Sequence, residues 1–337
     1  MTITWPRGAA TGVGSMPGDD PAESCRVLAG ELPDLPFLPE LPSRGPGSDL
    51  LGRAASILVD LHVDLQPSGW RLTSRAGVDE RRARDLLRRD LDALEVAFAG
   101  YAGPLKLQVC GPWTLCAGVE LPRGDRALAD PVARRDVSES LAEGLRVHVA
   151  DVAARVPGAT LIVQLDEPGL SAVRDGRIPT ASGFGAIAAV PDADLSDGLR
   201  AAVDACGVPT GVHCCADDPA LGVLAASGAV FLSVDSAKLV PRRDYDPIGE
   251  SFERGVVLLL GVVPSLDVDL DRTSVADAAA PARALGRALG VPPADLADRV
   301  VVTPTCGLAG ASPAYARAAL HRLTEVGRSL AEAPEER

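Results

Sequence analysis

Eight short apolar runs alternate with longer amphipathic stretches along this chain, and this alternation limits its possible folds more than any other feature. Several runs, such as LIVQL and VVLLLGVV, are almost continuously apolar, as expected of parallel strands that are buried on both faces. The predicted strands are Thr11–Ser15, Pro36–Leu41, Leu105–Cys110, Thr160–Asp166, Thr210–Cys215, Val230–Asp235, Val256–Val263 and Arg299–Thr305.

The stretches between these runs have the apolar spacing of helices that pack on a sheet with one face. Asp218 or Pro219, and the pair Ser312–Pro313, are residue types that often begin a helix. The predicted helices are Ala83–Gly100, Val137–Val156, Leu195–Cys206, Pro219–Gly228, Val275–Gly290 and Pro313–Ala333.

Eight strands joined by helices predict an α/β fold, a single (β/α)8 TIM barrel over residues 1–337. A doubly wound open sheet is the alternative, but Gly12–Ser15 (GVGS) does not complete the nucleotide-binding pattern G-x-G-x-x-G. Pro42–Arg82 is longer than one βα loop requires. We expect an extended, partly helical insertion there, after the second strand, with a helix at Asp49–Leu65 and a small hairpin at Gly69–Ala76.

The composition excludes several classes of protein. Lys and Arg total 33 against 46 Asp and Glu, a net charge of −13, whereas nucleic-acid binding depends on basic side chains. The longest apolar run, Val256–Val263, is far shorter than the roughly 20 residues of a membrane span. The first residues, MTITWPRGAATGVGS, contain no apolar core of a secretory signal. We therefore expect a soluble cytoplasmic protein that binds neither nucleic acid nor membrane.

The chain has 7 cysteines, and in a chain without an export signal they are expected to be free thiols or metal ligands. In a strand, alternate side chains share a face, so His213 and Cys215 of the sequence His-Cys-Cys point the same way, roughly 6–7 Å apart. Asp235 and Cys306 end two other predicted strands. One His, two Cys and one carboxylate are a plausible tetrahedral zinc set. The alternative is that the thiols are buried for packing.

Two further strand ends carry polar groups. Asp166 and Glu167 are adjacent acids after an apolar strand, and only one of them can point into the mouth of a barrel. The other reading is that one acid caps a helix or pairs with an arginine. Gly12–Ser15 offers backbone N–H groups and a hydroxyl to an anionic substrate group, or else is a tight turn.

These strand ends together resemble the catalytic, C-terminal half of cobalamin-independent methionine synthase. That family lies in a wider barrel superfamily that includes uroporphyrinogen decarboxylase and coenzyme M methyltransferases. The stretch LPFLPELPSRGPG is more similar to the short stand-alone members. The matching segments are TGVGSMPG (11–18), QVCGPWTL (108–115), VQLDEPGL (163–170), GVHCC (211–215), LSVDSAK (232–238) and TPTCGL (303–308).

The resemblance implies a zinc-dependent methyltransferase that binds a thiol, homocysteine above all, as a zinc thiolate for attack on a methyl donor, giving methionine. Zn2+ would be held by His213, Cys215, Asp235 and Cys306, with Asp235 where the family usually has Glu. Ser15 would bind the substrate carboxylate and Asp166 its ammonium group. Glu40, after the second strand, would be a further contact to the amino group.

Two departures leave the methyl donor open. The family has a His after the seventh strand, whereas the corresponding stretch of this chain, LLLGVVPSLDVDLD, contains none. The full-length synthases also have a second barrel, whereas we expect only one in this chain. The donor is a folate, methylcobalamin on a partner protein, S-methylmethionine or another compound.

Other hypotheses are a transferase for a coenzyme M-like thiol and an inactive barrel with a binding role. A decarboxylase is disfavoured because GSMPGDDPAES is acidic where that enzyme is Arg-rich. No sequence feature indicates an oligomeric state.

Overall fold

A parallel sheet of six strands forms the centre of the protein in a computed structural model, which describes residues 5–332. Its strand order follows the chain, and each strand agrees within one residue at either end with one of the predicted strands. The strands are β3 (Pro104–Cys110), β4 (Thr160–Asp166), β5 (Thr210–Cys214), β6 (Phe231–Asp235), β7 (Val257–Val263) and β8 (Val300–Pro304).

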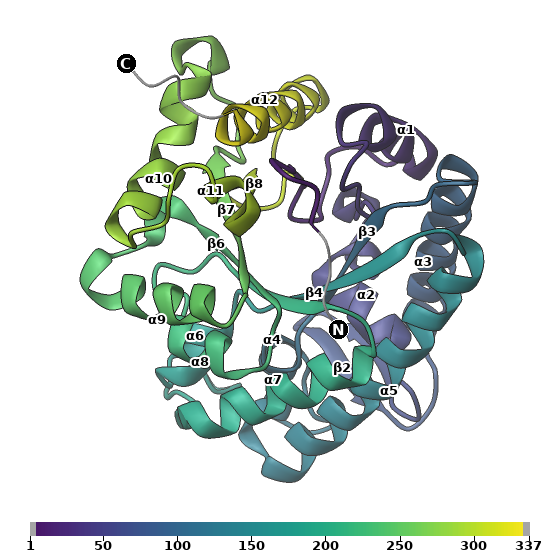
Figure 1. Cartoon of the computed structure of the whole chain (residues 1–337). Helices are drawn as coiled ribbons and strands as arrows, with labels where there is room; N and C mark the ends of the chain where they lie inside the picture. The colour runs from purple at the N-terminus through teal and green to yellow at the C-terminus, as the bar shows by residue number, and fades with distance from the viewer. Residues whose placement is uncertain (1–4, 333–337) are drawn as a thin grey trace.

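Helices surround the outside of this curled sheet (Figure 1). The helices α1 and α12, from opposite ends of the chain, lie side by side. Within residues 5–332, no helix combines the length and apolarity needed to cross a membrane. The helices are α1 (Pro21–Glu31), α2 (Leu50–Ile57), α3 (Val78–Ala97), α4 (Pro112–Gly118), α5 (Pro131–Arg155), α6 (Leu170–Arg174), α7 (Asp192–Cys206), α8 (Leu221–Ala226), α9 (Pro241–Glu253), α10 (Val275–Ala288), α11 (Leu296–Arg299) and α12 (Pro313–Ala331).

The first two predicted strands are not strands in the structure. Thr11–Ser15 and Pro36–Leu41 pair only through single parallel bridges, which join Ala10 to Val302, Ser15 to Glu40 and Phe37 to Lys106. These bridges place the two segments between β8 and β3. Proline explains part of the difference, since Pro36 and Pro39 have no N–H to donate to a ladder.

The predicted helix Asp49–Leu65 is too long. Helix α2 ends at Ile57, and Asp60 has a left-handed φ of 60° that no helix continues through. His62–Gln66 instead forms β1, which pairs antiparallel with β2 (Gly69–Thr73). The predicted hairpin Gly69–Ala76 is therefore only the second arm of a longer hairpin. Two short 3-10 turns, Pro42–Arg44 and Pro46–Ser48, precede α2.

Helix ends were predicted with mixed success. Ser312 caps α12 as expected, because its hydroxyl accepts from the backbone N–H of Tyr315. Asp218 does not begin a helix: α8 starts at Leu221, and the Asp218 side chain pairs with Arg174. The predicted end of the last helix, Ala333, lies outside the described residues. Helix α9 was not predicted because it is mostly polar and contains a proline.

The two faces of the sheet bury different groups. On the outer face, residues such as Leu165 and Val302 join the large core beneath the helices. The alternate residues form a small apolar cluster of their own, which includes Ile162, Phe231 and Leu259. Because side chains alternate along a strand, this cluster fills the inner face near the amino ends of the strands. The inner-face positions nearer the carboxyl ends are mostly polar, and they form the candidate site.

Candidate metal and substrate site

His213, Cys215 and Cys306 form a cluster at the carboxyl ends of β5 and β8. One ligand atom from each, a ring nitrogen and two sulfurs, all lie within 4.8 Å of one another. His213 and Cys215 share the inner face of β5, whereas Cys214 between them is fully buried in the outer core. The structure thus brings together three of the four side chains that were predicted to bind metal.

The two nitrogens of the His213 ring are in different situations. Nδ1 lies 2.9 Å from the hydroxyl of Ser233 on the neighbouring strand β6. Nε2 is buried and has no hydrogen-bond partner. An unpartnered polar atom is costly in a buried site. Ser233 therefore orients the ring and leaves one nitrogen available for a further ligand.

The two cysteines of the cluster lie within hydrogen-bond distance of each other. The thiol of Cys306 lies 3.3 Å from that of Cys215. The contact with Cys215 and the nearby ring of His213 hold the pKa of Cys306 below its usual range, while the contact with Cys306 raises the pKa of Cys215. Burial instead raises the pKa of each of the other five cysteines. All seven cysteines are free, and among them thiolate is favoured only within this cluster.

Asp235, the fourth predicted ligand, ends β6 but is not one of the three grouped side chains. Its Oδ1 accepts a hydrogen bond of 2.9 Å from the N–H of Ala237, at the start of a 3-10 turn. Burial raises the pKa of its carboxyl group, and the charge of Cys306 raises it further. Asp235 therefore lies within electrostatic reach of the cluster, and one of its two oxygens has a structural partner.

Asp166 lies beside the cluster, directly opposite His213 in the register of β4 and β5. It is buried, and its Oδ1 accepts a 2.7 Å hydrogen bond from Nε2 of Gln164. Burial raises the pKa of Asp166, while His213 and Lys106 lower it. The carboxylate faces the inside of the sheet and has few hydrogen-bond donors, a setting suited to a cationic ligand.

The adjacent acid, Glu167, has a structural role. Its two oxygens accept hydrogen bonds from the backbone N–H groups of Trp113 and Thr114 and from the hydroxyl of Thr114, at 2.6–2.9 Å. These groups belong to the first turn of α4, so Glu167 caps that helix. Burial raises the pKa of Glu167 to about 7. Only one of the two acids faces the site, as strand alternation requires.

Glu40 approaches the site from the second bridged segment. It is buried, and the Nε of Arg53 on α2 lies 3.2 Å from its Oε1. Burial raises the pKa of Glu40 to about 7; Arg53 lowers it, Asp166 raises it and Lys106 lowers it. Glu40 and Asp166 are therefore close enough to repel each other, and buried cations on α2 and β3 offset that repulsion.

Ser15 lies between two sets of side chains. One is the acid group, Glu40 and Asp166, and the other is the thiol cluster, His213, Cys215 and Cys306. Its backbone bridges to Glu40, and its carbonyl accepts a 2.8 Å hydrogen bond from the N–H of Leu308. A Cβ placed on Gly307 would lie 2.0 Å from the Ser15 hydroxyl. Glycine therefore lets Ser15 lie against the chain directly after Cys306. All the predicted substrate residues thus lie near one another at one end of the sheet.

The sequence analysis assigned no role to four buried polar residues of this region. Lys106 and Gln108 occupy alternate positions of β3, Gln164 lies on β4, and Arg53 lies on α2. A signal was present in β3 (PLKLQVC), where two polar residues two positions apart interrupt an otherwise buried strand. No comparable signal marks Arg53, because its role depends on tertiary contacts.

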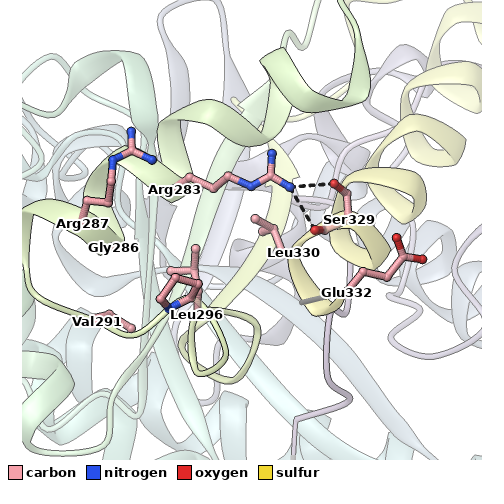
Figure 2. A pocket seen from close by; sticks show the side chains of 9 residues that line it. Arg283, Gly286, Arg287, Val291, Leu296, Ser329, Leu330 and Glu332 are labelled. Atoms are coloured by element: carbon pink, nitrogen blue, oxygen red, sulfur yellow. Dashed lines mark hydrogen bonds between the residues drawn. The ribbon is translucent and has the colours of Figure 1, made fainter. Parts of the chain in front are cut away.

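A cavity elsewhere lacks these chemical groups. It has a volume of about 430 Å³, and Figure 2 shows Arg283 inside it, donating hydrogen bonds to the backbone and hydroxyl oxygens of Ser329. Val291 and Pro293 in its wall precede the amino end of β8, whereas Cys306 follows the carboxyl end. Its lining contains no His or Cys: Arg283, Gly286, Arg287, Val291, Pro293, Leu296, Ser329, Leu330 and Glu332.

Comparisons with known proteins support the fold. No protein-family model matches the sequence, and no curated protein matches it either. Among solved structures, the chain is similar to a B12-independent methionine synthase from Shewanella sp. W3-18-1 in complex with selenomethionine. The two are 13% identical, with a TM-score of 0.62 over 96% of this chain and 98% of that chain. At this identity the likeness shows a shared fold. A GH138 enzyme that targets pectin rhamnogalacturonan II, 9% identical with a TM-score of 0.31 over 74% of this chain and 35% of its own, is too dissimilar to support an argument.

Proposed function

We propose that this chain is a zinc-dependent methyltransferase that activates a thiol, homocysteine above all, for attack on a methyl donor to give methionine. The observation that carries the proposal is the cluster of His213, Cys215 and Cys306, within 4.8 Å of one another and beside the buried carboxyl group of Asp166. Homocysteine has both a thiol and an ammonium group, so it matches both parts of this site.

The donor atoms of the cluster fit zinc. Zn2+ prefers sulfur and imidazole nitrogen, in tetrahedral sets. The unpartnered Nε2 of His213 and the thiolate character of Cys306 are what a resident ion of this kind would use. We propose Asp235 as a further ligand. Zinc held there would favour the thiolate form of a substrate thiol.

The surrounding residues would bind the rest of an amino acid. Asp166 and Glu40 accept hydrogen bonds from the ammonium group, and the cation lowers the raised pKa of each acid. The hydroxyl of Ser15 donates to the substrate carboxylate. Because Ser15 lies next to Gly307, it holds the amino-acid end close to Cys306 and so orients the thiol toward the cluster.

The methyl donor stays open in this proposal among a folate, methylcobalamin on a partner protein and S-methylmethionine. The segment after β7, Pro264–Asp269, contains no His to protonate a leaving nitrogen. An inactive paralogue with a binding role is the second candidate. The observation that favours it is the hydrogen bond from Ala237 to Asp235, which occupies one oxygen of the expected fourth ligand.

We also propose that the whole chain is one (β/α)8 barrel domain that works in the cytoplasm and binds no nucleic acid. The single bridges at Ala10, Ser15 and Phe37 support this architecture, because they place two extended segments between β8 and β3. In this arrangement residues 42–82 contain an insertion after the second segment.

Zinc content tests the proposed function. Purified protein is expected to contain about one zinc ion per chain, and Cys306→Ser is expected to lose most of it. Cys214→Ser is the matched control, because Cys214 lies on the opposite face of β5 and should not affect zinc. Wild-type protein without zinc, or Cys306→Ser protein with full zinc, would rule the proposal out. Methyl transfer to homocysteine, measured with each candidate donor, separates the enzyme from the inactive paralogue.

A further inference from the structure

Two glutamines lie side by side beneath the acid group. Gln108 on β3 and Gln164 on β4 are direct partners in the parallel register, and both are buried on the inner face of the sheet. Each lies two residues before a carboxyl end of its strand. They are therefore one layer below the level at which Asp166 and His213 lie.

Each glutamine connects one bridged segment to one acid. Gln164 donates through Nε2 to the carbonyl of Val13 at 2.9 Å and to Asp166 at 2.7 Å. Gln108 donates through Nε2 to the carbonyl of Leu38 and helps to lower the pKa of Glu40. Val13 and Leu38 each lie two residues before the substrate residue of their segment, Ser15 or Glu40.

Lys106 links the two glutamine contacts. Its Nζ donates to the carbonyl of Val13 at 2.9 Å and to Oε1 of Gln108 at 3.2 Å, and lies 5.3 Å from the centre of the Phe37 ring. The side chain is completely buried, and no carboxylate lies within salt-bridge distance of it in the described residues. A buried ammonium without a carboxylate partner is costly. We therefore infer that Lys106 is kept for its hydrogen bonds, which hold the segment around Val13.

These side chains supplement a short backbone pairing. The segments around Ser15 and Glu40 have one bridge each to the sheet and one to each other, and each bridge consists of two backbone hydrogen bonds. Glycine also permits close side-chain contact: a Cβ on Gly14 would lie 2.5 Å from Gln108, and a Cβ on Gly12 would lie 2.3 Å from Phe37. The positions of Ser15 and Glu40 therefore depend on polar side chains from β3 and β4 as well as on a few backbone hydrogen bonds.

We propose that Lys106, Gln108 and Gln164 are positioning residues, which fasten the two bridged segments so that Ser15, Glu40 and Asp166 form one pocket for the amino-acid end of the substrate. This inference rests on the proposed function for the identity of the substrate. It assigns the three residues to the amino-acid end and gives them no part in holding metal.

Lys106→Met is the variant that tests this inference. Methionine has a similar length, so it fills the same buried space without the hydrogen bonds to Val13 and Gln108. It also removes a cation that lowers the pKa of Glu40 and of Asp166, so a second variant that keeps this charge is needed. The chain's other lysine, Lys238, is half exposed and pairs with Asp217, so Lys238→Met is the matched control. Gln164→Met is a second variant of the same network.

The first readout is hydrogen–deuterium exchange, which does not depend on any substrate. Lys106→Met and Gln164→Met are expected to increase exchange in peptides that cover residues 9–16 and 36–41, whereas Lys238→Met leaves them unchanged. Unchanged exchange in both network variants would overturn the proposal.

The second readout compares the binding of homocysteine with that of propanethiol, which has the thiol but no amino-acid end. Lys106→Met is expected to weaken homocysteine binding roughly tenfold, the usual scale for hydrogen bonds to a charged group, with propanethiol binding and zinc content unchanged. Equal loss for both thiols, loss of zinc, or no loss for homocysteine would each overturn the assignment. Wild-type protein that binds both thiols equally would instead contradict the proposed function, and the exchange experiment would still decide the positioning role.

Discussion

The thiol cluster and the acid group are neighbours, but they are built in opposite ways. His213, Cys215 and Cys306 have an unpartnered nitrogen and two coupled thiols, and no cation of the chain pairs with them in the described residues. Glu40 and Asp166 are instead balanced by buried Arg53 and Lys106. The thiol cluster therefore offers ligand atoms that no cation of the described chain balances. The acid group already contains cations, which lower the raised pKa of its carboxyl groups.

The largest expected effect separates the two groups by removing a donor from the thiol cluster. His213→Ala is expected to abolish zinc binding, because an ion would keep only two sulfur ligands and the proposed contact from Asp235. Metal analysis after dialysis against a weak chelator measures the effect. Asp235→Asn is expected to weaken zinc affinity by about tenfold, as a lost or altered carboxylate contact does. Full zinc in His213→Ala would contradict this comparison.

The next effect concerns the built-in cations of the acid group. Arg53 contacts both Glu40 and the completely buried Asp90. Arg53→Met removes the ion-pair partner of Glu40 and one of the two arginines that contact Asp90, the other being Arg44. It is expected to lower the free energy of unfolding by about 3 kcal/mol, as measured by denaturant titration. Arg88→Ala removes a highly exposed ion pair with Asp85 and should cost less than about 1 kcal/mol. Similar costs for the two variants would show that the acid group does not depend on its cations.

A smaller effect is expected at the substrate contact itself. Asp166→Asn keeps the shape of the side chain and removes its charge. It should weaken homocysteine binding roughly tenfold, while zinc content and propanethiol binding stay as in the wild type. Calorimetric titration with the two thiols measures the difference. If the binding of propanethiol weakens as much as the binding of homocysteine, Asp166 acts on the thiol and not on the ammonium group.

A separate effect is a pH dependence outside both groups. The pKa of Glu167 is raised from 4.5 to about 7 by burial, so the folded protein binds more protons than the unfolded chain between these values. Its contribution to stability is therefore largest below pH 4.5 and is lost as the pH rises to 7. Glu167→Gln removes this term. The difference in unfolding free energy between wild type and variant should change between pH 4.5 and 7 and stay constant above it.

The thiol cluster was predictable because its residues are placed by local strand geometry. His213 and Cys215 lie two residues apart on a regular strand, and strand alternation alone puts them on one face. Cys306 and Asp235 end strands of the same parallel sheet, and the carboxyl ends of such strands meet at one edge. The structure groups three of these four side chains, while the part of Asp235 stays a prediction.

The acid group was less predictable because the positions of its residues depend on tertiary contacts. Arg53 reaches Glu40 from a helix whose extent was itself overestimated, and Lys106 donates to Val13, a residue 93 positions away in the chain. The segments of Ser15 and Glu40 are apolar enough to be predicted as strands. Their glycines and prolines limit the backbone pairing that the structure permits, and buried side chains compensate for it.

X-ray absorption at the zinc edge tests the central claim most directly, since it counts the sulfur atoms bound to the ion. We predict two sulfur ligands, from Cys215 and Cys306, in the purified protein and three after homocysteine is added. A sulfur count that homocysteine does not change would contradict the claim that this site activates a thiol.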